Sequence, residues 1–214
     1  MSAYLDEITI AEGICAITGY LCLRERKDLP STLLWAYVLL IFIAELTAVA
    51  LGKHYRNNIW FYNLLLLAQV SFFFYTFQQI LNQYVKFRPI IIVGLVLVLV
   101  TYGYDLINHG PMIRHHYSHT VFGLYIVALS LYFFYLQLIS NEFIDLKTNA
   151  IFWWVAGTLF FFFPLSVINI FGTPLRKILL NADNTLYITF KILNILLYTS
   201  WTYAFICKKW ETRS

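Results

Sequence analysis

The chain alternates long apolar runs with short charged connections, and this pattern predicts seven helices that cross a membrane. Each run is close to the roughly 20 residues that an α-helix needs to span the hydrocarbon core. A transmembrane barrel strand would alternate apolar and polar residues, whereas Ile90–Val100 is apolar on every side. The predicted helices are Ala3–Leu23, Thr32–Gly52, Asn58–Leu81, a segment from just after Pro89 to Asp105, Tyr117–Ile139, Asn149–Phe171 and Thr185–Cys207.

Composition supports the same fold class, an all-α polytopic membrane protein. Of the 214 residues, 60% are hydrophobic and only 12% are charged, whereas a soluble domain carries roughly 25% charged residues. No connection is long enough to form a domain, so residues 1–214 are expected to make one transmembrane domain with the lipid bilayer as its partner. The net charge of +4 lies in short loops and indicates no nucleic-acid partner.

The distribution of Lys and Arg over the loops predicts the orientation. Cytoplasmic loops carry an excess of these residues. With the N-terminus outside and the C-terminus inside, nine lie on the inner side: Arg24, Arg26, Lys27, Lys86, Arg88, Lys147, Lys208, Lys209 and Arg213. Five lie on the outer side: Lys53, Arg56, Arg114, Arg176 and Lys177. This bias favours N-outside and C-inside.

The polar residues inside the apolar runs are the candidate ligand-binding residues. Ionisable groups within a membrane are costly and usually face the bundle interior. The candidates are Glu12, Glu45, Asn63, Asp105, Lys191 and Asn194, with Gln69 and Asn169 as further polar positions. Glu12, Glu45 and Lys191 are predicted to lie roughly 9–14 Å below the outer ends of their helices.

In a bundle that closes in sequence order, the first, second and last helices are neighbours. Lys191 is then expected to pair with Glu45, Glu12 or both, in a polar pocket that opens to the outside above a hydrophobic floor. A structural alternative stays open, because Lys191 could snorkel to the interface. The pair and the amides could equally serve to hold helices together.

All five histidines fall on the predicted outer side. His115 and His119 are spaced i, i+4, which would place both imidazoles on one helix face and could hold a divalent metal such as zinc. His109, His54 or Asp105 would complete the ligand set. The run lacks the Glu of the H-E-x-x-H pattern, and exposed loop histidines commonly have no metal role.

Several short segments resemble a group of small bacterial seven-helix membrane proteins of unassigned function. The matching residues are Glu12, Ala44-Glu45-Leu46, Asn57–Asn63, Asn194-Ile195 and Tyr198. Gln69 departs from the pattern, because such proteins tend to have an acidic residue there. The resemblance implies a seven-helix fold in a bacterial inner membrane and carries no activity.

Three functions follow as hypotheses. The first is a sensory or ligand-binding module that takes a small or lipid-like ligand into the outer pocket and passes a signal to a membrane or cytoplasmic partner. The second is a metal-dependent hydrolase at the outer interface, with metal-bound water as nucleophile at the histidines. The third is a small transporter, which the absence of a visible repeat of broken helices disfavours.

Overall fold

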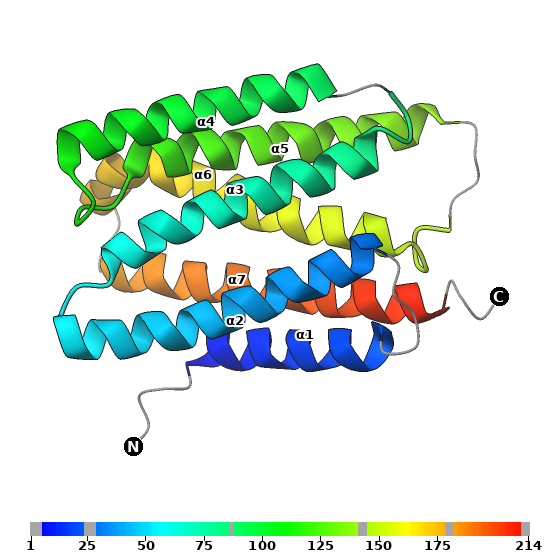
Figure 1. The fold of residues 1–214 in the computed structure, drawn as a ribbon, viewed down its shortest axis with the longest axis horizontal. Coiled ribbons are helices and arrows are strands. Elements are labelled where there is room, and N and C mark those ends of the chain that lie inside the picture. Colours follow the sequence, from blue (N-terminus) through cyan, green and yellow to red (C-terminus); the bar gives the residue numbers. More distant parts are fainter. Residues whose placement is uncertain (1–5, 24–28, 86–87, 141–144, 179–181, 211–214) are drawn as a thin grey trace.

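The computed structural model describes residues 6–23, 29–85, 88–140, 145–178 and 182–210, and in this part of the chain the fold is all-helical. Seven helices run side by side (Figure 1). They are α1 (Glu7–Leu23), α2 (Leu29–Tyr55), α3 (Ile59–Leu81), α4 (Arg88–His109), α5 (His116–Ile139), α6 (Ala150–Ile178) and α7 (Ala182–Trp210).

Six of these helices are long and apolar enough to cross a membrane, so the architecture is that of a multi-pass membrane protein. They comprise Ser31–Tyr55, Ile59–Leu81, Arg88–His109, His116–Ile139, Ala150–Gly172 and Asp183–Trp210. The exception is α1, whose 17 residues extend about 26 Å, less than a typical hydrocarbon core. It begins at Glu7 rather than at Ala3 as predicted, and residues 1–5 lie outside the described part.

The helices close into a ring in which α1 touches both α2 and α7, as the sequence predicts. The remaining neighbours around the ring are α2 with α3, α3 with α5, α5 with α6, and α6 with α7. Helix α4 packs against α3 and α5 and turns a row of apolar side chains outward. These include Ile92, Val93, Val96 and Val100, as expected of a helix facing lipid.

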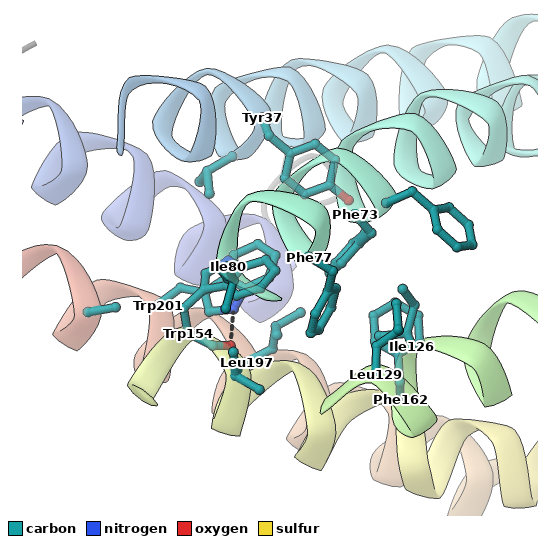
Figure 2. Close-up of a cluster of buried hydrophobic side chains, with 14 of the residues drawn as sticks. Tyr37, Phe73, Phe77, Ile80, Ile126, Leu129, Trp154, Phe162, Leu197 and Trp201 are labelled. Atoms are coloured by element: carbon teal, nitrogen blue, oxygen red, sulfur yellow. Dashed lines mark hydrogen bonds between the residues drawn. The ribbon is translucent and has the colours of Figure 1, made fainter. Parts of the chain in front are cut away.

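Aromatic side chains fill the middle of the ring. Phe73 on α3 is 1% exposed and its ring lies 5.2–6.2 Å from those of Phe162, Trp154 and Trp201. Figure 2 shows these rings, from α3, α6 and α7, converging with Tyr37 from α2. The indole N–H of Trp201 donates a hydrogen bond of 3.2 Å to the Trp154 carbonyl oxygen, which joins α7 to α6 in the core.

Candidate functional site

A buried carboxyl group lies at the junction of α1 and α7. Glu12 is only 3% exposed, and its carboxyl group interacts with the Tyr198 hydroxyl. Its second oxygen, Oε2, has no hydrogen-bond partner among the described residues. A buried polar atom without a partner is expensive, and Glu12 shares this property with Asp105, whose Oδ1 is also buried without a hydrogen bond among the described residues.

Further polar groups surround this carboxyl from two other helices. Tyr37 on α2 interacts with Gln69 on α3 and, electrostatically, with Glu12. Cys15, one helical turn after Glu12, interacts with the Thr202 hydroxyl on α7. We call Glu12, Tyr37, Gln69 and Tyr198 the Glu12 cluster; it joins four helices of the ring.

Glu45 on α2 is a second carboxyl, and it lies nearer to the end of the bundle where α2 connects to α3. The Tyr62 hydroxyl lies 3.1 Å from Oε1 and 3.0 Å from Oε2 of Glu45, and it donates to this carboxylate. Both side chains are half-buried. Glu45 also interacts electrostatically with Glu12, so two carboxyl groups face a common region lined by tyrosines.

The predicted pairing of Lys191 with Glu12 or Glu45 is wrong. The Lys191 ammonium lies 2.5 Å from a Glu7 oxygen and 3.1 Å from an Asp6 oxygen. Because α1 is short, its first residue lies level with Lys191, nine residues into α7. Lys191 is still 21% exposed there. A cation pairs at lower desolvation cost with carboxylates near water than with a buried one, and acidic residues suit a helix N-terminus.

Glu12 also lies deeper than predicted. Its partner Tyr198 is sixteen residues past the first residue of α7, which corresponds to about 24 Å along that helix. The sequence estimate counted from the expected start of α1 at Ala3. It could not anticipate that α7 begins well before α1 at this end of the bundle, as Figure 1 shows.

Asn63, which the sequence predicts as a ligand-binding residue, anchors the connection between α4 and α5. Its Nδ2 donates to the carbonyl oxygens of Pro111 at 2.9 Å and Ile113 at 2.8 Å. Its Oδ1 accepts from the backbone N–H of His115 at 3.2 Å. With three bonds to one loop and 2% exposure, Asn63 has little capacity left for a ligand.

Asp105 plays a comparable part at the start of α5. Its Oδ2 accepts hydrogen bonds from the Ser118 backbone N–H at 2.8 Å and the Ser118 hydroxyl at 3.0 Å. The carboxylate therefore satisfies a free N–H group in the first turn of α5, where negative charge is favoured. Its Oδ1 lies 3.6 Å from Nδ1 of His109. Asp105 thus lies with the loop and away from the Glu12 cluster.

The histidines do not assemble into the predicted metal site. Within the described ranges, no group of three or more His, Cys, Asp or Glu side chains is placed to hold a metal ion. His115 precedes α5; its Nε2 lies 3.3 Å from the Gly110 carbonyl oxygen, and its ring packs on Tyr102 at 4.8 Å. His119 lies within α5 and His109 ends α4, where His109 pairs with Asp105.

Asn194 is also buried, but its amide is used within its own helix. Its Nδ2 donates to the Phe190 carbonyl oxygen at 2.8 Å, the residue one turn earlier on α7. It lies one helical turn before Tyr198 on the same helix, and no described contact links it to the Glu12 cluster. The sequence-predicted residues therefore divide into two groups, with Glu12 and Glu45 together and Asn63 and Asp105 elsewhere.

A cavity of about 180 Å³ lies at the opposite end of the bundle from Glu45 and Lys191. It is lined by the beginning of α2, the end of α3, the beginning of α6 and the end of α7. Its lining residues are Ser31, Leu33, Leu34, Tyr75, Thr76, Gln79, Ile80, Gln83, Ala150, Ile151, Trp154, Ala204, Phe205 and Lys208. The sequence predicts an apolar floor in this half of the bundle, and it gives no sign of this cavity.

The tyrosine hydroxyls beside the carboxyls do not follow from the pattern of polar residues in the sequence. Tyr62 and Tyr198 enter there only through the family resemblance, and Tyr37 does not enter. Glu45 lies ten residues before the end of α2 and Tyr62 three residues after the start of α3, so residue counting alone does not place them at one depth. Buried Tyr hydroxyls usually find a hydrogen-bond partner, so a Tyr facing an intramembrane carboxyl is a reasonable pairing to test.

Together, the ring of helices, the six candidate spans and the interior carboxyls define a polytopic helical membrane protein with an acidic, tyrosine-lined interior. A comparison of the chain with protein-family models, curated proteins and solved structures finds no match. Function must therefore be argued from the side chains themselves.

Proposed function

We propose that this chain is a membrane-embedded sensory or ligand-binding module whose ligand is a small organic cation held at the Glu12 cluster. The observation that carries the proposal is the buried Glu12 carboxyl, which has an unpaired oxygen and no cation within salt-bridge distance among the described side chains. A buried carboxylate is tolerated when it is paired, and a bound ammonium group would supply the missing charge.

The surroundings of Glu12 suit such a ligand. Glu45 adds a second carboxyl, and Tyr37, Tyr62 and Tyr198 add aromatic faces, which attract cations. Glu45 lies nearer than Glu12 to the end of the bundle that we propose to be outside. We further propose that the membrane is a bacterial inner membrane, that α1 completes a seventh crossing, and that a membrane or cytoplasmic partner carries the signal onward.

Thermal unfolding of the purified protein in detergent tests the ligand class. We expect butylammonium or tetramethylammonium chloride to raise the unfolding temperature, and potassium chloride at equal ionic strength to leave it unchanged. Ligand at 100 times its Kd stabilises a protein by about 2.7 kcal/mol. Glu12→Gln should abolish the response, whereas the exposed carboxyl variant Asp183→Asn should retain it. A response of equal size in Glu12→Gln would refute the proposal.

The orientation is tested separately by cysteine labelling in right-side-out cells. Our proposal places His54 outside and Lys147 inside. A Cys introduced at position 54 should react with a membrane-impermeant maleimide in intact cells, and a Cys at position 147 should react only after the membrane is opened. The reverse labelling pattern would invert the topology and place Glu45 near the cytoplasmic face.

A further inference from the structure

The cavity between α2, α3, α6 and α7 has a polar rim and an apolar floor. Gln79 and Gln83 are exposed, and Ser31 and Lys208 are half-buried. The floor residues are more deeply buried, with Trp154 at 3% and Phe205 at 1% exposure. Figure 2 shows the side chains of Trp154 and Ile80, two of the residues that line this cavity.

The floor contains a polar atom without a described partner. The indole Nε1 of Trp154 is buried and makes no hydrogen bond within the described part of the chain, although the Trp154 carbonyl oxygen accepts from Trp201. A buried Trp N–H usually finds an acceptor. An occupant of the cavity that carries acceptor oxygens would satisfy it and would match the amide donors of Gln79 and Gln83.

The charge of the lining indicates the sign of the occupant. Lys208 is a cation, and no Asp or Glu is among the lining residues. Lysines at a membrane surface attract anionic lipid headgroups by about 1 kcal/mol each. The rim therefore complements a negative headgroup rather than the cation that we propose for Glu12.

The size of the cavity fits part of a lipid. A cavity of about 150 Å³ in another protein accepts benzene, so about 180 Å³ holds a short stretch of acyl chain rather than a whole lipid. We infer that this cavity is a binding site for an anionic phospholipid, with the phosphate at Lys208 and Gln83 and the upper part of one acyl chain against Trp154 and Phe205. This site is independent of the Glu12 cluster.

Native mass spectrometry of the full chain in detergent tests this site. The probes are dioleoyl phosphatidylglycerol and dioleoyl phosphatidylcholine, which share their acyl chains and differ in net charge. We expect one phosphatidylglycerol to be retained at about fivefold higher occupancy than phosphatidylcholine, the ratio that one favourable lysine contact supplies. Lys208→Gln should remove this preference. Lys209→Gln, the adjacent lysine outside the lining set, should keep it.

A second variant probes the apolar floor. Ala150→Leu adds volume at the edge of the cavity and should lower retention of both lipids, with size-exclusion chromatography confirming that the variant is folded. If Ala150→Leu does not fold, the comparison of Lys208→Gln with Lys209→Gln tests the site without it. Equal loss in those two variants would indicate attraction to a charged surface and overturn the site. Stoichiometric binding of glycerol 1-phosphate at the lipid's concentration would also overturn it, since the floor would then contribute nothing.

Discussion

Glu12 on α1 faces the Tyr198 hydroxyl on α7 inside the helix ring, and neither side chain has appreciable contact with solvent. This contact joins the shortest helix of the bundle to one of its longest. Oε2 of Glu12 has no hydrogen-bond partner among the described residues, so the carboxyl joins two helices while one of its oxygens stays unpaired.

Removing the Tyr198 hydroxyl should destabilise the protein. Tyr198→Phe removes the hydroxyl that interacts with the buried Glu12 carboxyl, and the loss of a polar partner for a buried group costs about 1–3 kcal/mol. Glu12→Gln should cost less, because an amide can still bond to the hydroxyl. The measurement is thermal unfolding in detergent, with the double variant to obtain the coupling energy.

The control for this cycle is Tyr135→Phe, which removes a hydroxyl from an exposed position on α5. It should change stability by less than about 0.5 kcal/mol, as surface substitutions usually do. Additive effects of Tyr198→Phe and Glu12→Gln would show that the two side chains do not interact.

Asn63 predicts a different phenotype, because it acts on the loop rather than on the ring interior. Asn63→Ala removes two donated bonds to Pro111 and Ile113 and one accepted bond from His115. We expect a loss of about 2–4 kcal/mol, given about 1 kcal/mol for each bond and the cost of leaving buried groups unpaired. Hydrogen exchange should accelerate at the His115 amide while Glu12-dependent ligand binding is retained.

Asn108→Ala is the matched control for that variant. Asn108 is exposed and donates only to the Tyr104 carbonyl oxygen of its own helix, so its loss should be close to neutral. Should Asn63→Ala abolish ligand binding while the fold and the loop stay intact, Asn63 would belong to the binding site after all.

The ion pairs of Lys191 give a pH prediction. Hydrogen bonding to Glu7, followed by the nearby Lys191 ammonium, holds the pKa of Asp6 below its usual value of 3.8. A group whose pKa is lowered on folding stabilises the folded state above its unfolded pKa and loses that contribution as the pH falls through its folded value. The unfolding temperature should therefore drop below about pH 4.

Lys191→Met should reduce the fall of the unfolding temperature below about pH 4. Lys53→Met, which changes an exposed lysine on α2, should leave this fall unchanged. The effect should be smaller than that of Asn63→Ala, because Asp6 is 40% exposed and partly exposed pairs contribute little. If the unfolding temperature of Lys191→Met fell as much as that of the wild type at low pH, the pH dependence would belong to other carboxyls.

The sequence was enough to predict the helices and the closure of the ring, because long apolar runs have few alternatives in a bilayer. It grouped Glu12 with Glu45, which do interact, but the residue count gave the wrong depth for Glu12. It failed for Lys191 because the pairing depended on where α1 begins, and α1 begins at Glu7 rather than at Ala3. It failed for Asn63 and Asp105 because a loop's need for hydrogen bonds leaves no periodic signal in the sequence.

Helices α6 and α7 pack closely where Gly157 meets Ser200, and this contact depends on both residues being small. A Cβ atom at Gly157 would lie 2.6 Å from the Cβ of Ser200 and 3.5 Å from the Leu197 carbonyl oxygen. Gly157→Ala should therefore push the helices apart and cost about 1–3 kcal/mol, as overpacking usually does. Gly172→Ala on the same helix meets no atom within 4 Å and should be neutral or slightly stabilising, because Ala favours helix. Ser200→Gly should restore much of the stability lost in Gly157→Ala by removing the atom that it meets. Failure of this rescue, measured by thermal unfolding of the double variant, would mean that the α6–α7 spacing is set elsewhere.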